Sequence, residues 1–127
     1  MGMAMLVISE DATSEDLAPL ALAINEIVRL PVTIRSANKP GVRVEKGKVL
    51  NGNYTGPVLE EVLKTGRSVR IIPGSGAFKG TPVAVSPIVS GGKTIAAIGI
   101  VDLAGTIDLP EVLGAYTDIV RQVEEKR

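Results

Sequence analysis

The stretch TPVAVSPIVSGGKTIAAIGIV, residues 81–101, decides the fold of this chain. Residues 82–89 and 94–103, the second run ending two residues beyond this stretch, are almost continuously apolar, and the SGGK sequence that joins them is typical of a tight β-hairpin turn. Strands that are apolar on both faces are usually covered on both faces, so we expect this hairpin to lie centrally in an antiparallel sheet. Three small residues in the second run favour a helix packed closely on it: Ala96, Ala97 and Gly99.

The rest of the chain predicts three helices and several short strands around this hairpin. Apolar residues recur at helical spacing over residues 14–29, 57–64 and 109–126. Thr13 and Asp16 have the spacing of a capping box at the start of the first helix. Extended segments are expected at residues 31–35, 42–45, 48–50 and 68–72, with turns at residues 46–47 and 51–53. Residues 1–127 are therefore expected to form one α+β domain. We expect an antiparallel sheet of about five to six strands, with the N- and C-terminal helices packed on one face.

Composition excludes several classes of function. The chain has no cysteine and no histidine, which removes thiol chemistry, disulfides and the commonest general base and metal ligand. We therefore expect no metal site and no enzymatic activity. Basic and acidic residues balance at 14 each, and only three residues are aromatic, so we expect no nucleic-acid partner. The apolar start is short and lacks a basic region, so we expect no membrane segment and a cytoplasmic location.

The hairpin, together with the order of elements, resembles the GAF and PAS sensor domains, which commonly carry a late Pro-Ile, glycine-turn, Ile-Gly hairpin. A narrower resemblance adds three segments to the hairpin: LPVTIRS at residues 30–36, NKPGVRV at 38–44 and YTGPVLEEVL at 54–63. Together they are similar to an uncharacterised archaeal family typical of methanogens. The last strand pair also resembles profilin-like haem- and small-molecule-binding proteins, although this chain lacks the histidine and cysteine that hold haem. These resemblances imply a GAF/PAS/profilin-like fold and a non-catalytic sensing or regulatory role.

We expect the ligand pocket on the sheet face opposite the terminal helices, with Arg35, Tyr54, Arg70, Lys79 and Asp102 at its rim. Paired arginines can clamp a carboxylate or phosphate, although exposed edge positions explain them equally well. Tyr54 offers an amphipathic wall, and the alternative is an ordinary turn residue before a helix. Lys79 lies in a glycine loop at residues 74–80 whose backbone amides suit an anion, and the alternative is a flexible connection. The ligand and any cofactor are unknown.

Two further hypotheses concern partners. Asp102 and Asp108 suggest a carboxylate pair for Mg²⁺, but Asp108 is better explained as a helix cap. The first helix carries apolar residues widely around it, which predicts a homodimer through the terminal helices: Leu17, Leu20, Leu22, Ala23 and Ile27. The chain has no recognisable output domain, so a sensor of this kind requires a separate signalling partner. The alternatives are a homodimeric interaction module without a ligand and an enzyme that relies on Lys, Asp, Glu or Tyr.

Overall fold

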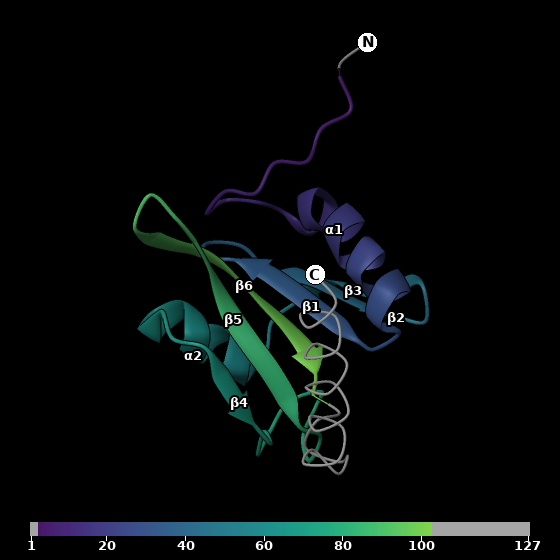
Figure 1. Ribbon diagram of the computed structural model, residues 1–127, viewed down its shortest axis with the longest axis vertical. Helices are drawn as coiled ribbons and strands as arrows, with labels where there is room; N and C mark the ends of the chain where they lie inside the picture. The colour runs from purple at the N-terminus through teal and green to yellow at the C-terminus, as the bar shows by residue number, and fades with distance from the viewer. Residues whose placement is uncertain (1–2, 103–127) are drawn as a thin grey trace, which may run out of the picture.

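A computed structural model of the chain describes residues 3–102. The two described helices are α1 (Ser14–Val28) and α2 (Pro57–Thr65). The described strands are β1 (Val32–Ser36), β2 (Gly41–Glu45), β3 (Lys48–Tyr54), β4 (Val69–Ile71), β5 (Val83–Ser90) and β6 (Lys93–Val101). They form one antiparallel sheet in the order β3-β2-β1-β6-β5-β4 (Figure 1). The predicted α+β class and antiparallel sheet are confirmed.

The β5–β6 hairpin forms as the sequence predicts. Its register runs from Val83 opposite Val101 to Ser90 opposite Lys93. Gly91 and Gly92 make the turn with φ angles of 60° and 74°, the left-handed conformation that a two-residue hairpin turn requires at both positions. β6 pairs with β1 on its other side and is central, whereas β5 has the three-residue β4 beyond it.

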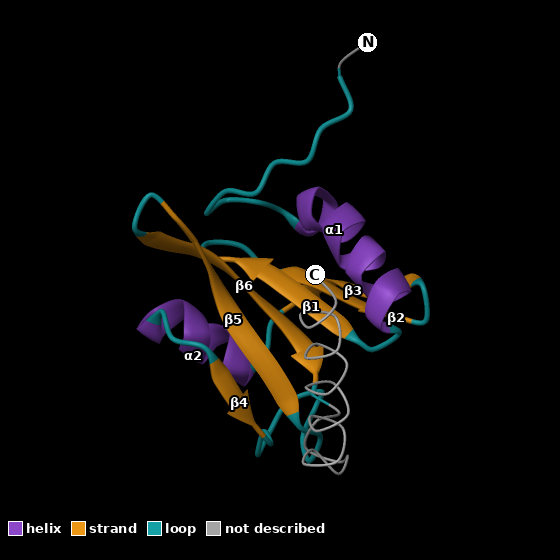
Figure 2. Cartoon of the chain, viewed as in Figure 1, coloured by secondary structure: helices purple, strands orange, loops and turns teal. Residues whose placement is uncertain are grey.

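The two helices cover opposite faces of the sheet, as Figure 2 shows. Alternation along β6 turns Ile98 and Ile100 toward α1, while Ala97 joins the core beneath α2. We call these the α1 face and the α2 face. Within the described residues, α1 does not cover β5, where Ser86 is exposed on the α1 face. Within the described residues the expectation of cover on both faces is confirmed for β6, and for β5 it stays a prediction. The helix predicted at residues 109–126 lies outside the described residues.

The turn predicted at residues 51–53 is wrong. β3 continues through these residues to Tyr54, and it forms one edge of the described sheet. Its pairing with β2 contains register shifts between Gly41 and Arg43 and between Arg43 and Val44. Such bulges accommodate extra residues on one strand and blunt an exposed edge. Glycine and asparagine, which usually indicate a turn, are tolerated here because this strand buries only Tyr54.

The predicted capping box at the start of α1 is confirmed. The Asp16 backbone N–H donates to Thr13 Oγ1 at 3.3 Å, and the Thr13 backbone N–H donates to Asp16 Oδ2 at 2.9 Å. The backbone hydrogen bond from Thr13, followed by that of its side chain, lowers the pKa of the Asp16 carboxyl below its ordinary value. The ionised carboxylate is therefore the form that favours the folded state.

We expect Asp16→Asn to reduce the change in the free energy of unfolding that wild type shows as the pH falls into the acid range. A carboxyl group whose folded pKa is depressed stabilises the fold above its unfolded pKa of about 3.9, and this contribution disappears as the pH falls through the folded pKa. The gap in urea midpoint between wild type and Asp16→Asn should be full at pH 6 and should shrink as the pH falls below the unfolded pKa and through the lowered folded pKa. Glu15→Gln, at an exposed neighbouring position, is the control. Parallel profiles for wild type and Asp16→Asn would contradict this role.

Candidate functional site

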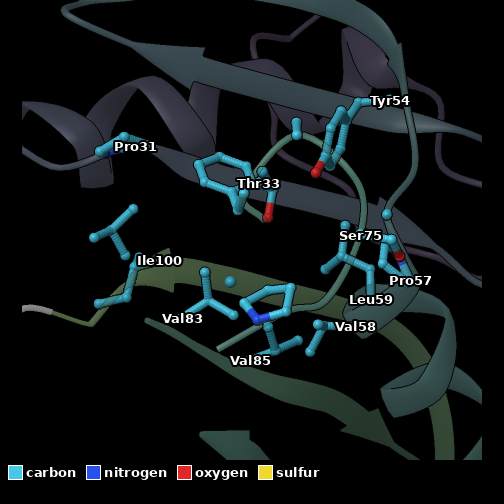
Figure 3. A pocket seen from close by; sticks show the side chains of 16 residues that line it. Pro31, Thr33, Tyr54, Pro57, Val58, Leu59, Ser75, Val83, Val85 and Ile100 are labelled. Atoms are coloured by element: carbon cyan, nitrogen blue, oxygen red, sulfur yellow. The ribbon is translucent and has the colours of Figure 1, made fainter. Parts of the chain in front are cut away.

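A pocket lies on the α2 face of the sheet (Figure 3). Its floor comes from β1, β5 and β6, one wall from α2 and another from Tyr54 at the end of β3. Residues 73–80, which we call the roof loop, partly cover it from outside through Pro73, Ser75, Ala77 and Phe78. The cavity measures about 30 Å³, which is room for about two water molecules. The roof loop thus leaves a small, mostly apolar space.

The floor is shaped by a close approach at Gly99. A Cβ atom there would lie 2.9 Å from Val85 Cγ2 and 3.1 Å from Thr33 Oγ1. Real side chains essentially never make a contact as short as the first, so glycine leaves the room that the Val85 and Thr33 side chains occupy above β6. Thr33 and Val85 are both buried, yet both also line the pocket. The floor therefore combines an apolar surface with one hydroxyl group.

Two sets of contacts hold α2 in place. One lies on the side of the helix that packs on the sheet, and the other lies at its N-terminal end. Leu59 and Val62 are buried against β5 and β6 and hold the helix on the sheet. At the start, Arg35 Nη1 donates to Thr55 Oγ1 at 2.7 Å and lies 3.8 Å from a Glu60 carboxylate oxygen. The side chain of Arg35 is only 13% exposed and also donates to the backbone carbonyls of Ser36 and Ala37. Arg35 therefore ties β1 to the beginning of α2.

The roof loop is held by few contacts. At its base the Gly80 N–H donates to the Pro73 carbonyl at 3.0 Å. Further along, the Phe78 ring meets Tyr54 edge-on, with centroids 6.4 Å apart and an interplanar angle of 81°. The Arg43 guanidinium stands 5.0 Å from the centre of the Phe78 ring, within the range of a cation–π interaction. Phe78 therefore holds the roof loop against strands β2 and β3, and we call it the latch.

Arg43 and Tyr54 supply the polar surroundings of this latch. Arg43 pairs with Glu45 at 3.0 Å, and its Nε is buried without a hydrogen-bond partner in the described part of the chain. Burial raises the pKa of the Tyr54 phenol, and the positive charge of Arg43 opposes the rise only in part. Tyr54 therefore stays protonated at neutral pH. Within residues 3–102 neither its hydroxyl nor that of Thr33 makes a hydrogen bond, so both remain available to a ligand.

Comparison with known proteins assigns the chain to a protein family. Residues 24–104 match the model of a family described as an uncharacterized protein conserved in archaea, DUF2111. The chain belongs to this archaeal family. It is also 45% identical over 117 residues to an uncharacterized protein of Methanocaldococcus jannaschii, MJ0405, covering 91% of this chain and 83% of that protein. No solved structure matches. The predicted resemblance to an archaeal, methanogen-type family is confirmed.

All residues that line the pocket fall within the segment matched by the archaeal family, whereas most of α1 precedes it. The pocket is thus built from the part of the chain that defines DUF2111. No helix among residues 3–102 combines the length and hydrophobicity needed to cross a membrane. The same residues contain no group of three acidic side chains that could hold a metal ion. Asp108, the other half of the proposed magnesium pair, lies outside the described residues.

The structure does not bring the five predicted rim residues of this DUF2111 chain together. Tyr54 lines the pocket, and Arg35 lies on the same face but binds the start of α2. Arg70 instead borders the shallow, open part of the α1 face, where it pairs with Asp102 at 2.9 Å. Lys79 belongs to the roof loop but is exposed and absent from the lining. The predicted common rim is therefore divided between two faces of the sheet.

Sequence reasoning missed Thr33, Arg43 and Phe78 as parts of the site. Thr33 lies directly opposite Arg43 in the β1–β2 register, so both side chains leave the same face of the sheet. The available signal was a polar residue at the centre of each of two otherwise apolar strand segments, VTI and VRV. For Phe78 there was no comparable signal, because its contacts depend on how the roof loop folds back over the sheet.

Proposed function

We propose that this chain is a sensing domain that binds a small molecule in the pocket under the roof loop. The observation that carries the proposal is the pocket itself, an apolar space assembled from separate elements and partly covered by one loop. Its lining carries the hydroxyls of Thr33, Tyr54 and the exposed Ser75, none of which has a hydrogen-bond partner among the described residues. The resemblance of the hairpin and the element order to GAF and PAS sensor domains supports the same reading. Ligand sites are typically concave, mostly apolar and provided with a few polar groups, as this one is.

Binding requires the roof loop to move. The space of about 30 Å³ admits little more than water, so the loop must lift to make room for a larger ligand. Lifting it separates Phe78 from Arg43 and Tyr54, the contacts that hold it down. Arg43 lies on β2, beside the edge strand β3. A ligand that displaces Phe78 would thus alter the environment of Arg43 next to an exposed edge, where a separate signalling partner could respond.

A metabolite panel in thermal-shift assays tests this function. We expect at least one small molecule to raise the melting temperature of the full chain, because a ligand that binds only the folded state stabilises it. Ala77→Leu places a larger side chain in the roof of the pocket and should abolish the shift. Ala23→Leu, on the exposed side of α1, is the matched control and should retain it. A shift that persists in Ala77→Leu would place the ligand elsewhere.

We expect Phe78→Ala to unlatch the roof loop. The substitution removes the edge-on contact with Tyr54 and the ring beneath Arg43, which together should contribute about 1 kcal/mol. Hydrogen exchange should become faster at the Gly80 amide, whose bond to Pro73 closes the loop. Val89→Ala, at an exposed site near the hairpin turn, should leave this exchange unchanged. An unchanged Gly80 amide in Phe78→Ala would show that Phe78 is not the latch.

A homodimeric interaction module is the second candidate function. It is favoured by exposed apolar residues on and before α1, namely Ile27, which is 81% exposed, with Met3 at 85% and Met5 at 73%. Large apolar side chains exposed in this way can form contacts with another molecule where they gather into a patch. Analytical ultracentrifugation decides the matter, since this candidate requires a dimer and the sensing proposal does not. A dimer that gives no thermal shift with any metabolite would favour the interaction module.

A further inference from the structure

We propose that the ligand of this pocket is small and uncharged, with an apolar body and one hydrogen-bonding group held by Thr33 and Tyr54. This inference rests on the proposed sensing function and specifies its chemistry. Alcohols, ketones and primary amides with short branched carbon chains belong to this class. Carboxylates, phosphates and amines do not.

The lining of the pocket disfavours a charged ligand. Among the described residues that line it, the only ionisable group is the phenol of Tyr54, whose pKa burial raises, so it stays neutral. Neither neighbouring arginine lines the pocket: Arg43 pairs with Glu45 at 3.0 Å through Nη2, although its Nε has no partner among the described residues, and Arg35 is held by Thr55 and two backbone carbonyls. An ion transferred here would lose its hydration without gaining a counter-charge. The site therefore selects against both anions and cations.

The two free hydroxyls specify the polar group. Thr33 is 6% exposed and Tyr54 is 7% exposed, and neither hydroxyl has a hydrogen-bond partner among the described residues. Figure 3 shows both oxygen atoms turned into the pocket. Each hydroxyl can donate to a ligand oxygen and accept from a ligand N–H or O–H. A single carbonyl, hydroxyl or amide can therefore satisfy one or both of them.

The apolar surroundings specify the body of the ligand. Leu59 from α2 and Val83 and Val85 from β5 supply branched aliphatic surface around the hydroxyls. Water can bond to the hydroxyls but gains nothing from this aliphatic wall. A molecule with a short branched chain replaces that water, keeps the hydrogen bond and buries apolar surface. The space of about 30 Å³ must enlarge to take even a few carbon atoms, so we expect the body to be small.

Isosteric pairs that differ in charge test the inference. Isobutyramide and isobutyrate have the same shape, and acetamide with acetate and isovaleramide with isovalerate extend the series in size. Titrations of the ¹⁵N-labelled full chain should show amide-proton shifts at Thr33, Val85 and Gly99 with the neutral members. The carboxylates should bind at least about tenfold more weakly, as expected for an ion desolvated without a partner.

Two variants test the role of the hydroxyls. Thr33→Val and Tyr54→Phe preserve the shape of each side chain and remove its hydroxyl. Each should weaken binding of the best neutral ligand about two- to tenfold, the effect of one hydrogen bond. Ser86→Ala removes a hydroxyl from the opposite face of the sheet and should change nothing. Unchanged binding in both hydroxyl variants would overturn the assignment of the polar contact.

The outcomes separate this inference from the proposed function. If a carboxylate or another charged molecule binds as well as its neutral partner, with shifts at the same pocket residues, the ligand class is wrong and the sensing function stands. If no member of the series binds and the metabolite panel also gives no thermal shift, the sensing function itself fails.

Discussion

Replacing Gly41 with alanine should destabilise the domain severely. A Cβ atom at this position would overlap the carbonyl oxygen of Ile34 and lie 2.5 Å from Arg35 Cα. Both atoms belong to the backbone of β1, which is bound to β6 on its other side and cannot retreat without disturbing the centre of the sheet. We expect a loss of about 4 kcal/mol or more, above the usual cost of overpacking.

Urea denaturation followed by circular dichroism measures this effect. Gly74→Ala is the matched control, because a Cβ at Gly74 would meet no heavy atom of the described chain within 4 Å. It should change the free energy of unfolding by no more than about 0.5 kcal/mol. A Gly41→Ala protein with the wild-type urea midpoint would show that β1 and β2 do not approach each other as closely as described.

Leu17→Ala should have the second-largest effect. Leu17 is fully buried on α1 in a cluster that includes Ile34 and Val42 of the sheet. Its removal leaves a cavity at the contact between α1 and strands β1 and β2, and we expect a loss of about 3 kcal/mol. Because α1 covers only the α1 face, the pocket on the other face should keep its ligand at temperatures where the variant remains folded.

The control for Leu17→Ala is Leu50→Ala on β3. Leu50 is 55% exposed, so the same chemical change there should cost less than about 1 kcal/mol. Equal urea midpoints for the two leucine variants would contradict the described packing of α1. A loss of ligand binding in Leu17→Ala below its melting temperature would indicate that the two faces of the sheet are coupled.

Features specified by neighbouring residues could be predicted from the sequence. The Thr13–Asp16 capping box and the SGGK turn each depend on contacts within a few residues, and both form as expected. The apolar sequence of the hairpin also predicts the central position of β6 in the sheet, and β6 has buried residues on both faces. Local signals therefore predict the elements and much of the sheet.

Features that depend on distant parts of the chain could not be predicted. The sequence of β3 contains turn-forming residues, and only its position at the sheet edge allows the strand to continue. Arg70 is directed to the opposite face from Arg35 by the register of β4 on β5, which no local pattern specifies. The contact of Arg43 with Phe78 likewise joins β2 to a loop far along the chain. The candidate site could therefore be recognised only once the structure was known.

Native mass spectrometry of the freshly purified protein tests the sensing proposal most directly. The experiment compares wild type with Ala77→Leu, each measured beside its denatured mass. We predict that wild type carries a discrete extra mass, matching a small uncharged molecule, and that Ala77→Leu lacks it. A wild-type protein that shows no extra mass, even after incubation with the metabolite panel, would contradict ligand sensing in this pocket.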